Sequence, residues 1–364
     1  MVDDELSAKL GTVRRLFGDG QLSAIRLRGV DWFAWATCGG SSVVDASSES
    51  GVAEVLITES DALVLADRID GPRIADEQSF AGLRVVETSW AEPRAREEVV
   101  HELVGEGARV ASDRPRNDEA PLPDELVAAR RRLLPGEIER FRVIGRDAAA
   151  AVTEVLSAAA PTMSENELAG RAAAALLRRG LFPVVLLVGG ARRLPLYRHP
   201  LPTDEQIGER VMLVACARRY GLVANLTRFV YFRPPNGDEG ARHAAVAEVE
   251  AAAFAASTPP ATLGEVYGTI VDAYARAGYA GAERDHHQGG LAGYRAREEV
   301  ALPDSTTIIA KGAALAWNPS LPGAKIEDTV VAGDGGVEVL TVDPAWPTVE
   351  VAGRRRPDVL LAAG

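Results

Sequence analysis

A few side chains in the C-terminal two thirds of the sequence are of types that carry reaction chemistry. His199 lies in RHPLPT, and His286 and His287 lie in DHHQGG, beside glycine and turn-forming residues rather than on the apolar face of a helix. An imidazole titrates near neutral pH, so it can accept a proton and return it. Cys216 lies in an apolar run, where a cysteine is usually a small buried hydrophobe. Next to His199 or His287 it would instead form a thiolate and imidazole nucleophile pair, and both interpretations stay open.

The composition is that of a globular chain with an acidic surface. The 364 residues include 40 Lys and Arg against 52 Asp and Glu, a formal net charge of −12, which repels phosphate backbones and excludes nucleic acid as a partner. Two cysteines are too few for a disulfide framework, and the start MVDDELSAKL lacks the pattern of a signal peptide. The most apolar stretch, residues 182–191, is too short to cross a bilayer. We therefore expect a cytoplasmic protein with no membrane partner.

The N-terminal third is predicted to be a small α/β domain. Its periodicity predicts a helix over residues 4–17, a second helix over residues 97–104 and six strands, which are SAIRLR, WFAWAT, AEVLI, ALVLA, LRVVET and ARVAS. Residues 113–124 are polar, rich in proline and without periodicity, as expected of a linker. The N-terminal domain with its linker is therefore predicted to span residues 1–124, and the C-terminal domain residues 125–364.

The C-terminal domain is predicted to contain pairs of helices, each pair followed by strands. Helices are predicted over 135–159, 164–179, 241–256 and 263–277, and strands over 184–188, 211–217, 222–231, 307–310, 324–331 and 338–342. Ser164 and Glu167 form a capping-box pattern at the start of the second helix. This order is typical of an α+β domain with helices on one face of a curved sheet.

The polar segments of the C-terminal half follow one another in a characteristic order. YRHPLPTD is followed by VMLVACARRYGLVANLTRFVYF, HHQGGLAGYRARE and AWNPSLPGAKIEDTV. The series resembles the pita-bread fold family of Xaa-Pro aminopeptidases, prolidases, methionine aminopeptidases and creatinase, and the resemblance covers the whole chain. It implies an α+β protein with a C-terminal pita-bread domain, whose curved antiparallel sheet carries outer helices, and an N-terminal creatinase-like α/β domain.

The resemblance also identifies the positions of the family's metal ligands. Peptidases of the family bind two divalent metals through two Asp, one His and two Glu, which correspond here to Val214, Asn225, His287, Asn318 and Glu327. Only His287 and Glu327 keep a ligand of the family's type. Because two ions held close together need several carboxylates, we expect no dinuclear metal site and no cofactor. A single weakly held ion on His287 and Glu327 is the alternative.

Creatinase is the member of the family that catalyses without metal. The resemblance of this sequence to creatinase implies roles for several residues. Its proton-transfer histidine corresponds to His199, and a carboxylate that holds a cationic substrate corresponds to Glu327. Its second such carboxylate corresponds to Thr227, which offers only a hydroxyl. Tyr294, at the position of the family's second histidine, could donate a hydrogen bond to an oxyanion. Arg198 could bind a substrate carboxylate.

By the same resemblance, the family's metal cavity is lined here by polar side chains and is covered by an aromatic residue. The lining residues are Cys216, Asn225, Thr227, His287, Asn318 and Glu327. Buried polar groups without partners cost about 1–3 kcal/mol each, so such a cavity is predicted to bind a polar ligand. Creatinase-like dimers place N-terminal aromatic residues over the partner's site. The resemblance therefore implies a homodimer in which Trp32, otherwise a core residue, contacts a cationic substrate.

These patterns predict a metal-independent hydrolase that acts on a carbon–nitrogen bond in a small-molecule substrate. His199 would be the general base and acid, and Glu327 with Asn225 or Asn318 would orient substrate or water. Two alternatives stay open: a non-catalytic binding protein, since pita-bread domains also serve as interaction modules, and a metal-dependent Xaa-Pro peptidase with a degraded site. The joint presence of His199, His287 and Glu327 favours the enzyme.

Overall fold

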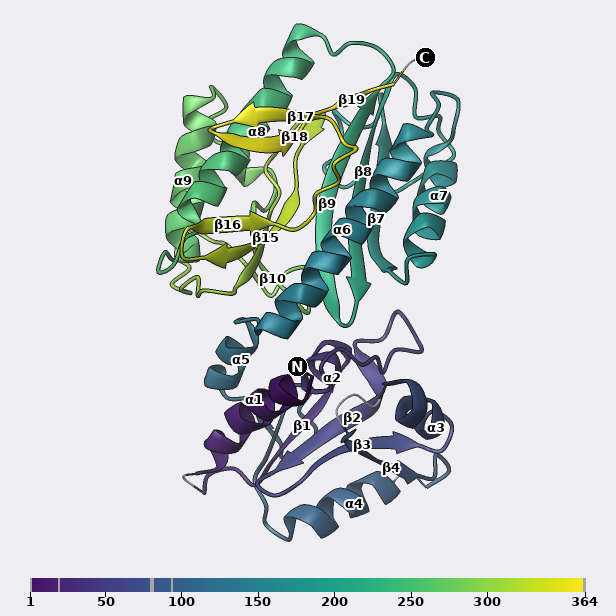
Figure 1. The fold of residues 1–364 in the computed structure, drawn as a ribbon, viewed down its shortest axis with the longest axis vertical. Coiled ribbons are helices and arrows are strands. Elements are labelled where there is room, and N and C mark those ends of the chain that lie inside the picture. Colours follow the sequence, from purple (N-terminus) through teal and green to yellow (C-terminus); the bar gives the residue numbers. More distant parts are fainter. Residues whose placement is uncertain (1, 19, 79–81, 93, 363–364) are drawn as a thin grey trace. The chain divides into compact units, whose positions relative to one another are not determined.

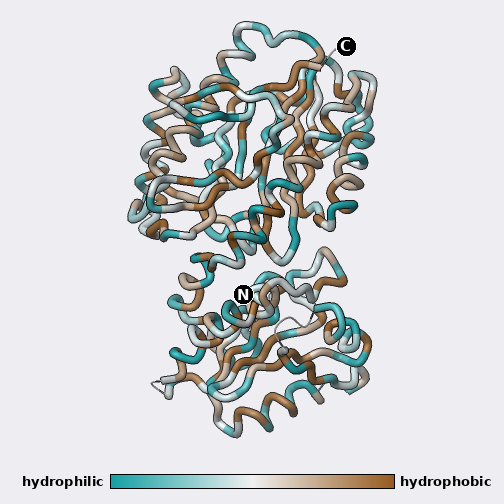
Figure 2. The backbone as a smooth tube through the Cα atoms, in the orientation of Figure 1, coloured by the Kyte–Doolittle hydropathy of each residue, from teal (hydrophilic) through white to brown (hydrophobic). Residues whose placement is uncertain are grey.

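The computed structural model describes residues 2–18, 20–78, 82–92 and 94–362. The chain folds into two compact units: unit 1 comprises residues 1–137 and 220–222, and unit 2 comprises residues 138–219 and 223–364 (Figure 1). Each unit has buried apolar clusters of its own, and hydrophobic residues run along its strands (Figure 2). The expected α+β class with two parts is confirmed. No described helix is long and apolar enough to span a bilayer.

Unit 1 is built on a six-stranded mixed sheet in the order β4-β3-β2-β1-β5-β6. Its strands are β1 (Ala24–Gly29), β2 (Ser50–Thr58), β3 (Ala62–Asp67), β4 (Arg84–Thr88), β5 (Val110–Ser112) and β6 (Ala120–Pro121). Its longer helices are α1 (Val2–Arg14), α2 (Val30–Ala36), α4 (Ala95–Val104) and α5 (Asp124–Arg130). Strands β1, β2 and β3 pair antiparallel, whereas β3 with β4 and β1 with β5 pair parallel. Five of the six predicted strands are therefore present.

The sixth predicted strand, WFAWAT, is wrong because these residues form helix α2. Every residue from Asp31 to Ala36 is buried, so the segment lacks the polar positions that would distinguish a helical period from a strand. The ring of Trp32 is only 4% exposed, and the Arg130 guanidinium lies 4.1 Å from its centroid. Arg130 also contacts Asp31 at 2.8 Å. Trp32 thus serves as a core residue of unit 1, with little ring surface left for a ligand.

Unit 2 contains two principal sheets. The first has the order β19-β9-β8-β7, from β7 (Phe182–Gly190), β8 (Arg210–Arg219), β9 (Leu222–Tyr231) and β19 (Leu360–Leu361). The second has the order β11-β10-β12-β15-β16, from β10 (Gly289–Ala292), β11 (Glu299–Val300), β12 (Ala314–Trp317), β15 (Asp328–Gly333) and β16 (Gly336–Val339). A bridge between Thr227 and Glu327 joins β9 to the segment before β15. The two sheets therefore meet at Glu327.

The helices of unit 2 cover these sheets. They are α6 (Pro135–Ser157), α7 (Glu165–Leu177), α8 (Gly237–Ala256) and α9 (Leu263–Arg276). In Figure 1, α6 and α7 lie beside β7 and β8, and α8 and α9 lie beside the second sheet. All four predicted helices are confirmed, and Ser164 Oγ accepts the Glu167 amide as its pattern predicts. The strand predicted at 307–310 is reduced to one isolated bridge at Ile308, so that prediction is wrong.

A buried group of charges fixes β15 beside β9. Asp328 is fully buried, and its two oxygens lie 2.8 Å from Arg228 and 2.6 Å from Arg356. Arg356 also contacts the fully buried Glu250 of α8 at 2.5 Å. Because a buried charge is tolerated only when it is paired, removal of one member leaves the others with an uncompensated desolvation penalty. The group thereby holds Glu327, the residue before Asp328, against Thr227.

Candidate functional site

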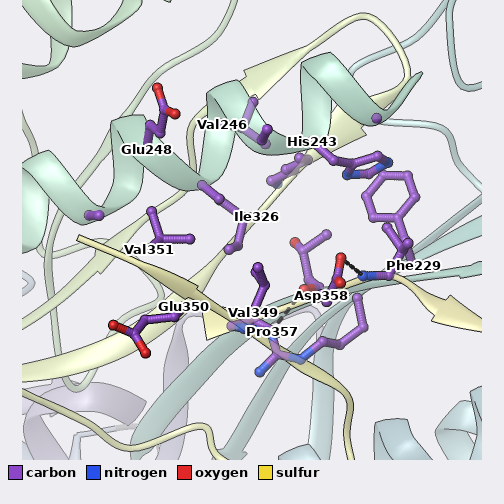
Figure 3. A pocket seen from close by; sticks show the side chains of 18 of the residues that line it. Phe229, His243, Val246, Glu248, Ile326, Val349, Glu350, Val351, Pro357 and Asp358 are labelled. Carbon is purple, nitrogen blue, oxygen red and sulfur yellow. Dashed lines mark hydrogen bonds between the residues drawn. The ribbon is translucent and has the colours of Figure 1, made fainter. Parts of the chain in front are cut away.

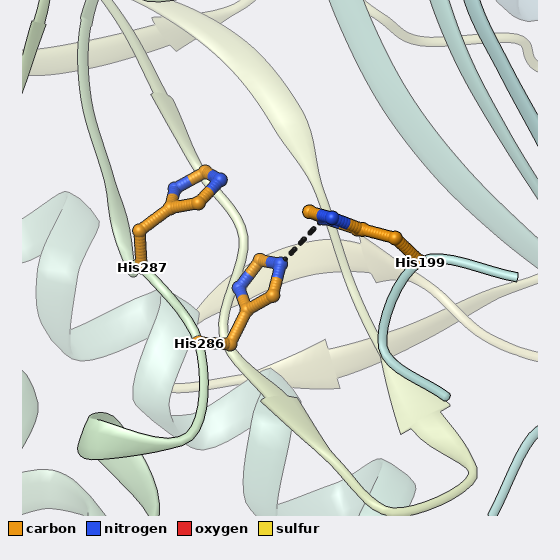
Figure 4. A group of neighbouring side chains, drawn as sticks. All are labelled: His199, His286 and His287. Carbon is orange, nitrogen blue, oxygen red and sulfur yellow. Dashed lines mark hydrogen bonds between the residues drawn. The ribbon is translucent and has the colours of Figure 1, made fainter. Parts of the chain in front are cut away.

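Three histidines from two loops converge in unit 2. His199 lies between β7 and β8, whereas His286 and His287 lie in the bend before β10. The Nε2 atoms of His286 and His199 are 2.8 Å apart, and one ring nitrogen of each histidine lies within 4.8 Å of the others (Figure 4). The rings of His286 and His287 are stacked, with centroids 4.4 Å apart. We call these three residues the histidine triad.

Glycines and an ion pair hold the two loops in place. A Cβ atom on Gly289 would lie 2.1 Å from the carbonyl oxygen of Ala316, so only glycine allows β10 to approach β12 directly after the bend. Arg198, next to His199, contacts Asp285, next to His286, at 3.2 Å. Arg198 therefore links the two loops in this structure, and binding of a substrate carboxylate would have to compete with Asp285.

The three imidazoles are neutral near pH 7. Burial, followed by the positive charge of Lys325, lowers the pKa of His199 from its usual value, although Glu327 opposes the effect. Burial and Lys325 lower the pKa of His286 to about 3, and burial and Arg297 lower that of His287 to about 4. Each ring consequently has one nitrogen with a lone pair for a proton or a metal ion.

Glu327 lies at the centre of a cluster of buried charges. Its Oε1 lies 2.7 Å from Arg297 Nη2, and its Oε2 lies 3.2 Å from Lys325 Nζ. The hydroxyl of Thr227 donates a further hydrogen bond of 2.9 Å to Oε2. Burial acts to raise the pKa of Glu327, but Lys325, Arg297 and these hydrogen bonds outweigh it and lower the pKa to about 2. We call Glu327, Arg297 and Lys325 the charge cluster.

The charge cluster changes the role expected for Glu327. Both carboxylate oxygens already contact a protein cation, so a cationic substrate would have to displace Arg297 or Lys325. One carboxylate and two cations give the cluster a net positive charge, which favours an anionic or electron-rich group. Neither Arg297 nor Lys325 is among the residues predicted for the site, although KIED places the lysine on the same side as Glu327 when the segment is extended.

Two asparagines near the charge cluster have buried amide oxygens. Asn225 is fully buried and Asn318 is 2% exposed, and neither Oδ1 atom has a hydrogen-bond partner among the described residues. The backbone places them close to the other site residues: Asn225 lies two residues before Thr227 on β9, and the backbone N–H of Asn318 donates to the backbone carbonyl of Gln288. These oxygens can accept hydrogen bonds from a bound N–H group or from water.

The cysteine is placed next to the charge cluster but is not activated. Cys216 is buried on β8, where burial and the negative charge of Glu327 raise the pKa of its thiol to about 12. The thiolate is the nucleophilic form of cysteine, so this shift favours the protonated, weakly nucleophilic thiol of Cys216 at neutral pH. The idea of a thiolate and imidazole pair is therefore not supported, and Cys216 is buried on β8 as a small apolar side chain.

Tyr294 is buried in the turn that follows β10, where its backbone amide donates to Glu298 at 3.0 Å. Its expected contact with an oxyanion stays a prediction.

A cavity of about 840 Å³ lies between α8, β9 and the hairpin of β17 (Thr348–Val351) and β18 (Arg354–Pro357). Figure 3 shows His243, Phe229 and Ile326 around it. Thr227 and Lys325 belong to its lining, so it reaches the edge of the charge cluster.

Comparison with known proteins identifies the class of this chain. The sequence pattern of metallopeptidase family M24 matches residues 139–334, more than half of the chain. The chain therefore belongs to metallopeptidase family M24, and the resemblance drawn from its motifs is confirmed. No curated protein matches the sequence significantly.

Several solved structures share the fold over almost the whole chain. Prolidase from Pyrococcus horikoshii OT3 has a TM-score of 0.78 at 18% identity, covering 92% of this chain and 98% of that one. Xaa-Pro dipeptidase from Bacillus anthracis has a TM-score of 0.77 at 19% identity, covering 93% and 98%. The N-terminal domain of the FACT complex subunit SPT16 from Cicer arietinum has a TM-score of 0.66 at 11% identity, covering 93% and 96%. At these identities the comparison establishes the fold alone.

At the five positions that the resemblance assigns to metal ligands, this chain offers one imidazole, His287, and one carboxylate, Glu327. Val214 has no donor atom, and it packs in an apolar cluster with Leu187 and Phe229. The single carboxylate, Glu327, is already neutralised by two protein cations. Divalent ions at this place would face Arg297 and Lys325 with no further carboxylate among the five positions.

Proposed function

We propose that this chain hydrolyses a carbon–nitrogen bond in a small polar substrate without the family's pair of metal ions, and that His199 is its general base and acid. The observation that carries the proposal is the charge cluster, in which Arg297 and Lys325 contact Glu327 at 2.7 and 3.2 Å. Protein cations thereby supply positive charge beside the family's ligand positions. Such fixed charges can stabilise an oxyanion without reorganisation.

The neutral imidazole of His199 supports its role in proton transfer. It would accept a proton from water as the water oxygen forms a bond to the carbon of the scissile C–N bond. It would then return that proton to the departing nitrogen as the bond breaks. His286 lies 2.8 Å away and holds the ring of His199 through their Nε2 atoms, so it acts as a positioning residue.

The buried amide oxygens support a substrate that donates hydrogen bonds. Asn225 and Asn318 would accept from N–H groups of the substrate, which removes the cost of leaving two buried acceptors without partners. The charge cluster, whose net charge is positive, would bind a negatively charged group of the same substrate molecule. A substrate that carries both an amide-like N–H group and a carboxylate fits these features better than a simple cation.

Activity after removal of metal ions tests this proposal. The dialysed protein should release amine or ammonia from at least one member of a panel of Xaa-Pro dipeptides and N-substituted amino acids, with the same turnover in chelator. We expect this because no step uses a metal ion. Chromatographic product analysis measures it. Turnover that appears only after loading with Mn²⁺ or Co²⁺ would instead establish a metal-dependent peptidase.

A binding protein is the second candidate, because the fold also occurs in the SPT16 domain of a protein complex. It differs from the hydrolase in one measurable respect: it would bind members of the panel without converting them. The neutral His199 and its contact with His286 favour the hydrolase, since simple binding does not need a group that exchanges protons.

We further propose that the protein is a homodimer, as the family resemblance implies and as is commonest among soluble assemblies. Light scattering of the purified chain should give twice the monomer mass of 38.6 kDa. A monomer over the accessible concentration range would refute the dimer.

Because Trp32 is buried, replacing it with alanine should lower the free energy of unfolding by about 3–5 kcal/mol, as for other large core residues.

A further inference from the structure

We propose that the histidine triad, His199, His286 and His287, is a binding site for one zinc-like divalent ion, distinct from the family's dinuclear site. Of the five positions that the family resemblance assigns to metal ligands, the triad includes only His287. His199 and His286 are additional donors, and they come from different loops. The proposed ion therefore lies on the histidine side of the site rather than between the carboxylate positions.

The geometry of the triad supports a single ion. One nitrogen of each ring lies within 4.8 Å of the other two, and the closest pair is separated by 2.8 Å. In a tetrahedral site with metal–nitrogen bonds of about 2.0–2.1 Å, neighbouring donor atoms are about 3.3 Å apart. The closest pair of nitrogens, at 2.8 Å, is nearer than this value, and the limit of 4.8 Å for the three nitrogens is larger than it. Binding of one ion therefore requires the rings to rotate until all three nitrogens face it.

The chemistry of the donors selects the class of ion. Three imidazole nitrogens without a carboxylate suit Zn²⁺, Co²⁺, Ni²⁺ or Cu²⁺ and are poor ligands for Mg²⁺ and Ca²⁺. His286 is buried, whereas His199 and His287 are only partly covered by the protein, so an ion can enter from solvent and keep an open position for water. Lys325 and Arg297 repel a cation and weaken its binding, and Glu327 offsets only part of this repulsion.

Occupation of the site has a functional consequence that rests on the proposed function. A metal ion would use the same lone pair of His199 that accepts the proton during hydrolysis. The ion and the proton therefore compete, and a bound ion inhibits the proposed hydrolase. The triad would then make the activity sensitive to the concentration of free Zn²⁺.

Titration of the dialysed full-length protein with Co²⁺ and Zn²⁺ tests the site directly. We expect one equivalent of Co²⁺ to give the visible absorption of a tetrahedral nitrogen-ligated ion, and Zn²⁺ to displace it. His286→Gln and His287→Gln should each weaken binding at least roughly a hundredfold, since each removes a ligand. His101→Gln, which replaces a histidine of α4 in unit 1, should leave the affinity unchanged. Circular dichroism of each variant establishes that it is folded.

Three results would overturn the proposal. These are the absence of stoichiometric binding, the binding of two equivalents, and equal affinity in a folded His286→Gln variant. Activity is measured separately: one equivalent of Zn²⁺ should abolish turnover of the panel substrate, and chelator should restore it. If Co²⁺ binds to the triad but the protein turns over no substrate, the metal site stands and the proposed hydrolase fails. If Zn²⁺ binds without inhibition, the competition at His199 is wrong.

Discussion

Replacing His199 with asparagine should lower kcat at least about a hundredfold, with little change in KM, because the variant keeps a hydrogen-bonding side chain but loses the group that exchanges a proton. The neutral state of His199 allows it to act as a base near pH 7. Its contact with His286 fixes which way the ring faces. Initial rates over a range of substrate concentrations, measured in chelator, separate the effect on kcat from that on KM.

The control for this experiment is His101→Asn, which makes the same chemical change on helix α4 of unit 1. It should leave both kinetic constants unchanged. A folded His199→Asn variant with full turnover would remove His199 from the mechanism. Because the pKa of Cys216 is raised to about 12, the cysteine would not then become the natural replacement, and His287 would be the next candidate base.

Replacing Asp328 with asparagine should lower the free energy of unfolding by about 3–5 kcal/mol, the usual effect of removing one partner from a buried ion pair. Asp328 is fully buried and lies 2.8 Å from Arg228 and 2.6 Å from Arg356. The variant removes the negative charge and leaves two guanidinium groups with less compensation. Urea unfolding, followed by the fluorescence of the buried tryptophans, measures the change.

The matched control breaks an ion pair at the surface. Arg142 and Glu338 lie 2.7 Å apart, but both side chains are more than 40% exposed, so Arg142→Gln should cost at most about 1 kcal/mol. If Asp328→Asn costs no more than this control, the buried charges do not fix β15 beside β9. In that case another interaction must hold Glu327 against Thr227.

The secondary structure of unit 2 could be predicted well because its signals are local. Helices α6 to α9 carry apolar residues at helical spacing, and the long strands β8 and β9 are apolar runs separated by a tight turn. In that turn Tyr220 and Gly221 both have positive φ, of 55° and 77°. Helix α2 was predicted wrongly because a short segment that is buried on every side has no periodic pattern to distinguish helix from strand.

The sequence was enough to predict the family and most of the helices and strands, because motifs and periodic patterns are properties of residues close together in the chain. Tertiary structure decided which charges meet. Arg297 lies 30 residues before Glu327 and could have paired with any nearby acid, but the fold brings the turn between β10 and β11 to the segment before β15 and places Arg297 2.7 Å from that carboxylate. In the same way, two loops 87 residues apart bring His199 to His286. Charges and imidazoles act over a few ångströms, so their chemistry depends on distances that only the folded chain sets.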